Sequence, residues 1–358
     1  MSLASGYELV ILDLDGVVYV GAEAIAGAPE SIGTLVDSGT PVAYVTNNAS
    51  RSTEEVASLL RSMGVPAGAD EVLTSARAAA ELLAADLPSA APVLVVGAPA
   101  LRDEIRSVGL TPVDGAAERP LAVVQGYGPD VGWAELAEAC VAIRAGARWV
   151  ATNTDPTLPS ARGALPGNGS LVAALITALD GRVPDTVVGK PHPALFVAAA
   201  RHRGVRRVLV VGDRLDTDIE GAARAGMDSM LVLTGVSTAA DVLRAAAHER
   251  PTHIAADLGA LAHPDDAARV PQWDTVEARA GQWRVTHDGG RLVLASDDGA
   301  ASTATPQPVD AVRALAAGAW AHPDWTGITA VGVAAEHTLE VLGLDRFTAW
   351  SIRAASAA

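Results

Sequence analysis

The stretch of sequence that decides the fold is Tyr7-Glu8-Leu9-Val10-Ile11-Leu12-Asp13-Leu14-Asp15-Gly16-Val17. It opens with a short apolar run, residues 7–12, which predicts a buried strand that ends abruptly at an aspartate. A second apolar run, residues 41–45, ends in the same way at a Thr-Asn-Asn sequence. Amphipathic patterns follow over residues 29–38 and 53–63, each closed by a glycine, so a helix is expected after each strand.

The same alternation returns in the second half of the chain. Further strands are expected over residues 187–189, 207–211, 230–233 and 252–255. Short apolar strands separated by helices are typical of a parallel α/β sheet, in which ligands bind outside the carboxyl ends of the strands. Polar residues that directly follow a strand are therefore the candidates for a site.

The segment between these two halves carries an α/β pattern of its own. Its expected strands are 92–96, 121–125 and 149–152, and its expected helices are 133–145 and 170–179. A self-sufficient pattern of this length predicts a second domain inserted into the first. We therefore expect a core domain of residues 1–76 and 185–262 and an inserted domain of residues 77–184, with hinges near 75–77 and 183–187.

The character of the sequence changes from about residue 263 onward. Prolines punctuate this part, and five of the seven tryptophans lie at Trp273 or later. Residues 282–285 and 291–295 predict paired strands joined by an Asp-Gly-Gly turn, and helices are expected over 309–320 and 330–342. We interpret residues 263–358 as a small α+β appendage whose tryptophans pack its own core, with a homodimer contact as the alternative.

Composition limits the classes of function. The chain has 358 residues, of which 49% are hydrophobic and 19% charged, as in well-packed globular proteins. Its formal net charge of −16 argues against a nucleic-acid partner, because such a surface needs clustered Lys and Arg. Cys140 is the only cysteine, so no intramolecular disulfide can form. Neither a leader pattern nor an apolar run of membrane-spanning length occurs, so no membrane partner and a cytoplasmic location are expected.

Asp13 and Asp15 are the strongest chemical signal. Two carboxylates placed two residues apart at the end of a buried strand repel one another, and a hard cation resolves that repulsion. Mg²⁺ prefers carboxylate and phosphate oxygens, so the pair predicts a magnesium site. Taken alone, a loop with two solvated acids explains the pair about equally well.

Three further polar clusters follow expected strands. Thr46-Asn47-Asn48 offers a hydroxyl, amides and backbone N–H groups that suit phosphoryl oxygens, although such residues are also common in turns. Lys190 stands between a glycine and a Pro-His-Pro run, where a fixed ammonium can offset phosphate charge; a solvated surface lysine is the plainer alternative. Asp213 opens a cluster of acids that suits a metal, and Asp216 or Asp218 is expected to hold the following helix and the nearby loops.

The order of these clusters and their places at strand ends resemble the haloacid dehalogenase superfamily over about residues 7–260. Asp13 and Asp15 match its first motif, Thr46 its second, Lys190 its third and Asp213 its fourth. The resemblance implies a Rossmann-like α/β core with a parallel sheet and an inserted α/β cap. The second aspartate of the first motif favours a phosphatase or phosphomutase over a dehalogenase.

The inserted segment narrows the resemblance further. Its Ala-Thr-Asn-Thr-Asp-Pro sequence at 151–156 and Pro-Gly-Asn-Gly-Ser sequence at 166–170 are similar to the cap of the subfamily that contains NagD-type and para-nitrophenyl phosphate phosphatases. In that cap, the residues expected near the substrate are Asn153, Asp155, Leu158 and Asn168. A tight turn before a helix is an equally good explanation of residues 166–170.

The resemblance implies Mg²⁺-dependent hydrolysis of a phosphomonoester. Asp13 would attack phosphorus and form an aspartyl-phosphate, and Asp15 would act as general acid and then general base. The metal would be held by the side chains of Asp13 and Asp213 and the backbone carbonyl of Asp15. Thr46, the neighbouring amides of Asn47 and Asn48, and Lys190 would hold the phosphoryl group.

The expected partner is a small phosphorylated metabolite. The appended C-terminal segment resembles actinobacterial members of this subfamily, and that resemblance makes glycerol 3-phosphate our first choice. Leu158 and the scarcity of aromatic residues in the cap offer little to stack a flat ring, which also favours a small polyol phosphate. Phosphoglycolate, pyridoxal phosphate, nucleotides and sugar phosphates are the alternatives. A phosphomutase and a non-catalytic binding protein that has kept the fold are the competing classes.

Overall fold

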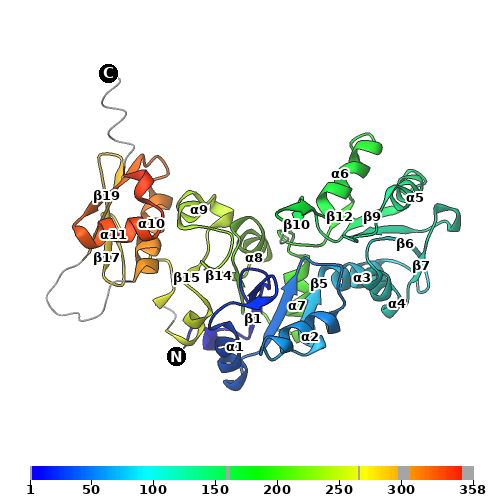
Figure 1. Cartoon of the computed structure of the whole chain (residues 1–358), viewed down its shortest axis with the longest axis horizontal. Coiled ribbons are helices and arrows are strands. Elements are labelled where there is room, and N and C mark those ends of the chain that lie inside the picture. Colours follow the sequence, from blue (N-terminus) through cyan, green and yellow to red (C-terminus); the bar gives the residue numbers. More distant parts are fainter. Residues whose placement is uncertain (1, 159–161, 265–266, 297–306, 349–358) are drawn as a thin grey trace.

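The computed structural model describes residues 2–158, 162–264, 267–296 and 307–348 (Figure 1). Its main sheet has six parallel strands in the order β15-β14-β13-β1-β4-β5. The strands are β1 (Leu9–Leu12), β4 (Val42–Thr46), β5 (Val72–Thr74), β13 (Val208–Gly212), β14 (Asp228–Val232) and β15 (His253–Ala255). The parallel α/β core expected from the sequence is confirmed, and β5 is a strand that the sequence patterns did not predict.

Every residue of β1 is buried, because helices cover both faces of the main sheet. Val10 and Leu12 face α1 (Ala28–Asp37) and α2 (Thr53–Ser62), whereas Leu9 and Ile11 face α7 (Ala194–Arg203). Successive side chains of a strand point to opposite faces, so one short apolar run supplies both layers of the core.

The inserted domain, which we call the cap, contains a five-stranded parallel sheet in the order β12-β9-β8-β6-β7. Its strands are β6 (Pro92–Val96), β7 (Thr111–Val113), β8 (Ala122–Gln125), β9 (Arg148–Ala151) and β12 (Thr186–Val187). Its helices are α3 (Ser75–Asp86), α4 (Pro99–Ser107), α5 (Trp133–Arg144) and α6 (Asn168–Ala178).

Strand β12 corrects one expectation about the second half of the chain. Residues 187–189 were expected to begin the return to the main sheet, but Thr186 and Val187 pair with Val150 and Ala151 of the cap sheet. A very short apolar run carries no information about which sheet it joins, and β9 offers it a free edge. The chain therefore returns to the core after Val187, beyond the boundary expected at residue 185.

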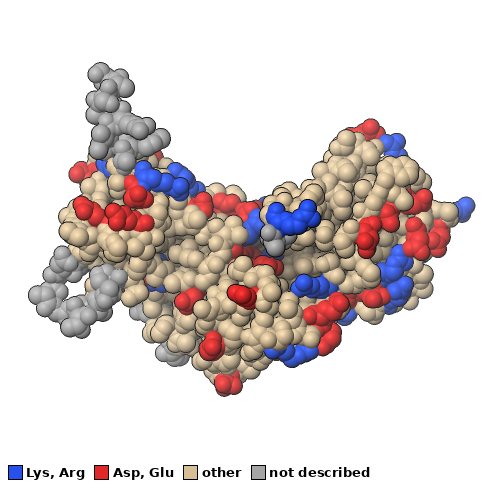
Figure 2. Space-filling model, in the orientation of Figure 1, with Lys and Arg blue, Asp and Glu red and all other residues tan. Residues whose placement is uncertain are grey.

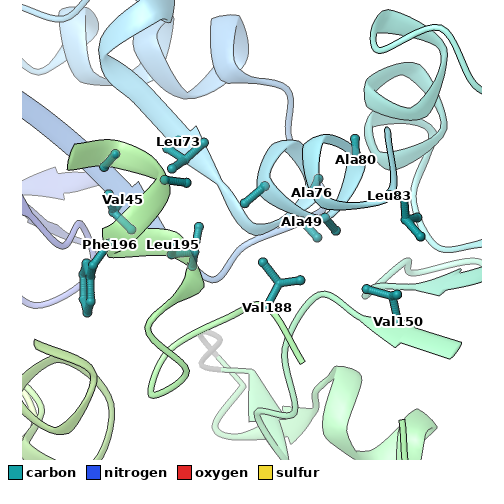
Figure 3. Close-up of a cluster of buried hydrophobic side chains, with 14 of the residues drawn as sticks. Val45, Ala49, Leu73, Ala76, Ala80, Leu83, Val150, Val188, Leu195 and Phe196 are labelled. Carbon is teal, nitrogen blue, oxygen red and sulfur yellow. The ribbon is translucent and has the colours of Figure 1, made fainter. Parts of the chain in front are cut away.

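Core and cap share one apolar cluster (Figure 3). Val45 and Leu73 of the main sheet, Ala76 and Leu83 of α3, and Val150 of the cap sheet all belong to it, and each is buried. Because α3 packs against both the main sheet and the cap, the segment where the chain crosses from core to cap is itself part of an apolar core.

The appendage contains a four-stranded sheet in the order β16-β17-β18-β19. Its elements are β16 (Glu277–Ala280), β17 (Trp283–Asp288), β18 (Arg291–Ser296), α10 (Pro308–Ala321), β19 (Gly327–Val331) and α11 (Val333–Val341). The predicted hairpin is confirmed: Asp288 pairs with Arg291, and Gly289 and Gly290 between them have φ values of +54° and +77°.

The last predicted helix begins later than expected. Residues 330–342 were assigned to it, but residues 327–331 form β19, which runs parallel to β18, and α11 starts at Val333. The alternating pattern of a half-buried edge strand is short here, so the helical period that follows it was extended too far.

The tryptophans of the appendage that the structure describes pack in its core. Trp283 is fully buried, and Trp273, Trp320 and Trp325 lie against the same cluster, which supports their expected packing role. Trp350 lies outside the described residues. Among the described residues, no helix has the length and apolar character that crossing a membrane requires.

Candidate active site

Three neighbouring strands of the main sheet, β13, β1 and β4, bring the candidate residues together. Asp13 directly follows β1, Thr46 is the last residue of β4, and Asp213 directly follows β13. Because the strands are parallel, their carboxyl ends meet at the same edge of the sheet.

Lys190 lies between two carboxylates at this edge. Its Nζ is 2.5 Å from Asp13 Oδ1 and 2.6 Å from Asp218 Oδ1, and its side chain is 4% exposed. Burial disfavours the charged ammonium, but Asp13 and Asp218 together raise the pKa of Lys190 above its usual range. Lys190 is therefore a fixed buried cation and not the solvated surface lysine that was its alternative explanation.

Asp13, Asp213 and Asp218 form a potential metal site. Each offers one carboxylate oxygen, and these oxygens all lie within 4.8 Å of one another. Asp213 Oδ2 accepts a hydrogen bond from the backbone N–H of Val236 at 2.7 Å, whereas its Oδ1 is buried without a hydrogen-bond partner. A buried carboxylate oxygen without a donor is costly in an apolar surrounding, and a bound cation removes that cost. The donor set fits Mg²⁺, which prefers carboxylate oxygens.

Glycines allow the loops to close around Asp213. Gly16 has a φ of +82°, and a Cβ atom there would lie 2.4 Å from Asp213 Oδ2. A Cβ atom on Gly235 would lie 2.0 Å from the same oxygen. Only glycine permits this approach. The need for glycine at position 16, directly after Asp15, is therefore explained by its packing against Asp213.

Asp15 is placed differently from Asp13. Its side chain is accessible to solvent, yet protein close around it raises the pKa of its carboxyl group by desolvation, with Lys190 opposing. Thr46 is buried, and its Oγ1 accepts a hydrogen bond from the backbone N–H of Asn48 at 3.1 Å.

Asn47 joins the loops of the core and the cap. Its Nδ2 donates to Asp155 Oδ2 and to the carbonyl oxygen of Lys190, both at 3.1 Å, and its Oδ1 accepts from the backbone N–H of Lys190 at 2.8 Å. Its carbonyl oxygen accepts from Ser75 Oγ at 2.6 Å and Asn153 Nδ2 at 2.7 Å. We expected side-chain amides here to hold phosphoryl oxygens, but the Asn47 amide is already engaged with the protein.

The side-chain oxygen of Asn48 is also engaged locally. Its Oδ1 accepts from the N–H and the hydroxyl of Ser50, each at 2.8 Å. This turn shapes the loop after β4, and it is the ordinary turn chemistry that was the alternative explanation of the Asn-Asn sequence.

The expected cap residues divide into two groups. Asp155 faces Asn47, and burial raises the pKa of its carboxyl group; Leu158 ends β10 (Thr157–Leu158) and is half-buried. Asn168 is only 1% exposed, and its Nδ2 donates to the carbonyl oxygen of Asn153 at 2.7 Å. Asn168 therefore holds the loop that carries Asn153, and its expected place near the substrate stays a prediction.

The two supporting acids also differ. Asp218 is fully buried, contacts Lys190, and accepts a hydrogen bond from the backbone N–H of Arg214 at 3.2 Å. The Asp216 side chain is 59% exposed and pairs with the Arg214 guanidinium at 2.7 Å. The spacing of the two acids in the sequence did not show which of them is buried. In the structure, Asp218 lies on the side of the turn that faces Lys190, five residues after Asp213.

The fold and the site together define a class of protein: a hydrolase with a parallel α/β core, in which a strand-end aspartate faces a metal site and a buried lysine. The chain belongs to the haloacid dehalogenase-like hydrolases. Residues 10–111 match the family model described as haloacid dehalogenase-like hydrolase, and residues 187–261 match the model described as HAD-hydrolase-like.

Two curated relatives show how far the similarity extends. A D-glycerol 3-phosphate phosphatase of Mycobacterium tuberculosis is 46% identical over 322 residues, which cover 89% of this chain and 87% of that protein. A 5′-nucleotidase of Bacillus subtilis is 39% identical over 249 residues, which cover 69% of this chain and 94% of the nucleotidase.

Solved structures give the same picture. The crystal structure of a glycerol phosphate phosphatase from Mycobacterium tuberculosis in complex with magnesium has a TM-score of 0.86 and 43% identity, and the match covers 96% of this chain and 99% of that one. A p-nitrophenyl phosphatase from Archaeoglobus fulgidus has a TM-score of 0.67 and 31% identity, and the match covers 72% of this chain and 98% of that one.

Proposed function

We propose that this protein is a Mg²⁺-dependent phosphatase that hydrolyses a small phosphomonoester, with glycerol 3-phosphate as its preferred substrate. The observation that carries the proposal is that Asp13 contacts a buried ammonium, Lys190, and lies close to the carboxylates of Asp213 and Asp218, while Asp15 lies on the solvent side. A nucleophile, a charge-stabilising group and an acid thus stand at one sheet edge.

In the first step, a carboxylate oxygen of Asp13 attacks phosphorus while the bond between phosphorus and the ester oxygen breaks. Asp15 donates a proton to the leaving oxygen, which departs as an alcohol. Its raised pKa favours the protonated form that this step needs. In the second step, water attacks the aspartyl-phosphate, Asp15 takes its proton, and inorganic phosphate leaves with Asp13 restored.

The other site residues stabilise charge and position. Lys190 offsets the negative charge of the phosphoryl group and keeps Asp13 oriented, and the Thr46 hydroxyl is a donor for a phosphoryl oxygen. Asp13, Asp213 and the backbone carbonyl of Asp15 would hold Mg²⁺, with Asp218 close by. Bound there, the metal would neutralise phosphate charge and orient the phosphoryl group for attack.

The choice of glycerol 3-phosphate is supported by the extent of the similarity. The M. tuberculosis glycerol phosphate phosphatase matches this chain over 96% of its length, so the match includes the appendage, whereas the p-nitrophenyl phosphatase covers 72%. In the cap, Trp149 is fully buried in the domain's own core and is not available to stack a substrate ring. Both observations favour a small polyol phosphate over a nucleotide or pyridoxal phosphate.

The cellular setting is a further part of the proposal. A glycerol 3-phosphate phosphatase would link glycerophospholipid metabolism to free glycerol, and we expect it to work in the cytoplasm. A homodimer stays a prediction, which light scattering of the purified chain would test.

The test is phosphate release from a panel of esters by wild type and Asp13→Asn, with and without Mg²⁺. The panel contains glycerol 3-phosphate, phosphoglycolate, pyridoxal phosphate, sugar phosphates and nucleoside monophosphates. We expect Mg²⁺-dependent release, highest with glycerol 3-phosphate, that disappears in Asp13→Asn. A different best ester would replace the substrate but keep the mechanism, and activity that survives in Asp13→Asn would refute the nucleophile.

A further inference from the structure

A second pocket, of about 600 Å³, lies where the appendage meets the core domain. Leu243 and Arg244 at the end of α9 (Ala239–Arg244) and Arg250 after it line one side; Trp325, Arg346 and Phe347 of the appendage line the other. None of the candidate active-site residues lines it. On the face shown in Figure 2, basic side chains lie where the appendage approaches α9.

The three arginines of this pocket lack acidic partners. Within the described part of the chain, no carboxylate lies at salt-bridge distance from Arg244, Arg250 or Arg346. The chain has 42 acidic and 26 basic residues, so a group of three unpaired arginines is the opposite of what its average composition would produce. This pocket therefore carries local positive charge in a protein whose formal net charge is −16.

Aromatic rings contact each of these arginines. The guanidinium carbons of Arg244 and Arg346 lie 4.6 Å and 5.2 Å from the centroid of the same Phe347 ring, and that of Arg250 lies 5.4 Å from the Trp320 ring. Cation–π contacts favour each guanidinium individually, but like charges around one ring repel each other. A multiply charged anion bound in the pocket that all three line would offset this repulsion.

We propose that this pocket binds a phosphorylated metabolite through its phosphate or polyphosphate group, at a site separate from the catalytic centre. The planar guanidinium presents paired N–H donors that match phosphate oxygens, and three such side chains line this one pocket. The volume suits a small metabolite, and Trp325 provides apolar surface for the rest of it.

The position of the pocket gives such a ligand a structural consequence. Its lining comes from the core domain on one side and the appendage on the other, so a bound anion would contact both. Because a ligand that binds only the folded state stabilises it by mass action, binding should raise the melting temperature of the full chain.

Calorimetric titration of the full chain with pyrophosphate in EDTA tests the proposal, because the metal needed to hold an anion in the catalytic centre is then absent. The variants are Arg244→Gln and Arg346→Gln; both side chains are exposed and should not be required for folding. The matched control is Arg201→Gln on α7, an exposed arginine outside the pocket.

We expect wild type and Arg201→Gln to bind one equivalent of pyrophosphate, more weakly as salt increases, and to melt at a higher temperature when it is bound. Each pocket variant should lose affinity by about tenfold, the scale of a charge-assisted contact, while keeping wild-type phosphatase activity. The Arg346→Lys variant keeps the positive charge but loses the paired N–H donors of the guanidinium, so it should bind pyrophosphate with intermediate affinity. Absence of binding to wild type, or equal binding by wild type and both pocket variants, would overturn the proposal.

Discussion

Lys190 is buried with a carboxylate on each side, so its ammonium is tied to both stability and chemistry. Lys190→Met would leave Asp13 and Asp218 buried and facing one another. Since breaking a buried ion pair leaves an uncompensated charge, we expect the metal-free protein to lose about 3–5 kcal/mol of its free energy of unfolding. Urea unfolding in EDTA measures this loss. An unchanged transition would show that the two carboxylates do not depend on Lys190.

Asp216 and Asp218 form a matched pair of acids two residues apart. Asp218→Asn removes the charge that contacts Lys190, and we expect kcat to fall by roughly 100-fold because Lys190 and Asp13 lose their orientation. Asp216→Asn removes an exposed pair with Arg214, which is worth about 0–1 kcal/mol, and should leave kcat within about twofold. Steady-state kinetics of both variants check the contrast; equal effects would contradict it.

Asp213 should link metal binding to pH. Burial and Asp218 raise the pKa of Asp213 to about 6, above the ordinary value of 3.8. The folded metal-free protein therefore holds this proton more tightly than the unfolded chain, so the group favours folding below about pH 4, and that contribution is lost as pH rises through about 6. Mg²⁺ needs the carboxylate, so the proton and the metal compete.

We accordingly expect the Mg²⁺ affinity to fall as the pH drops below about 6, by about tenfold for each pH unit from Asp213 alone and more steeply where Asp13, whose pKa burial also raises, takes up a proton. Calorimetric Mg²⁺ titrations across this range measure it. Asp213→Asn should abolish binding at every pH, and an affinity that is flat down to about pH 5 would contradict the link.

At this scale the sequence was most informative where a polar residue follows a strand. Asp13, Thr46 and Asp213 could be predicted to converge, because parallel strands end at one edge. The contact of Asn47 with Asp155 could not, since its partners are 108 residues apart and in different domains. The position of that contact depends on how the cap packs, which no local pattern encodes.

Among the elements, the first turn of α6 carries a prediction about glycine. A Cβ atom on Gly169 would lie 2.2 Å from the carbonyl oxygen of Thr154, next to the cap residues Asn153 and Asp155. Gly169→Ala should therefore push that loop away from the core, raising KM and lowering stability by roughly 1–3 kcal/mol. Thermal unfolding and KM for the best ester test both effects.

Gly33 is the matched control for this change. It lies inside α1, and a Cβ atom there meets nothing within 4 Å. Gly33→Ala should leave KM unchanged and raise stability by about 0.5–1 kcal/mol, because glycine is the poorer helix former. If Gly169→Ala and Gly33→Ala changed KM and stability alike, the close approach to the Thr154 carbonyl would not be the reason for glycine at position 169.

The elements themselves were predicted well where the apolar period is sustained and poorly where it is brief. α10 was expected over 309–320 and spans Pro308–Ala321. β5 and β19, both short, were missed, and β12 was assigned to the wrong sheet. Strand pairing is decided by partners distant in the chain, so a run of a few apolar residues fixes neither its sheet nor its neighbours.

Over the whole molecule, the sequence predicts a division into core, cap and appendage, but it does not predict the apolar clusters that run between them. One apolar cluster runs from the main sheet through α3 into the cap, and another runs from α9 and β15 into the appendage. Such clusters combine side chains from separate segments, each of which looks complete in its own pattern. The inferred hinge at 75–77 therefore lies within a packed region, whereas residues 183–187 are exposed or half-buried.

The joint between appendage and core depends on Arg313 of α10. Its buried guanidinium pairs with Asp310, and its Nε donates to the carbonyl oxygen of Ile254 in β15 at 2.7 Å. Trp320, further along α10, donates from Nε1 to the carbonyl oxygen of Val242 in α9 at 2.9 Å. Because these contacts and the shared cluster cross the joint, we expect wild-type core and appendage to unfold in a single calorimetric transition.

Arg313→Ala should separate the two parts. It leaves Asp310 half-buried without its partner and the Ile254 carbonyl without its donor, so we expect a loss of about 3–5 kcal/mol and a second transition at lower temperature. Arg106→Ala, which removes an exposed pair with Asp103 in the cap, is the control and should shift stability by less than about 0.5 kcal/mol. If Arg313→Ala instead unfolds in one transition near the wild-type temperature, the appendage is held by apolar packing alone and the buried arginine adds nothing to the joint.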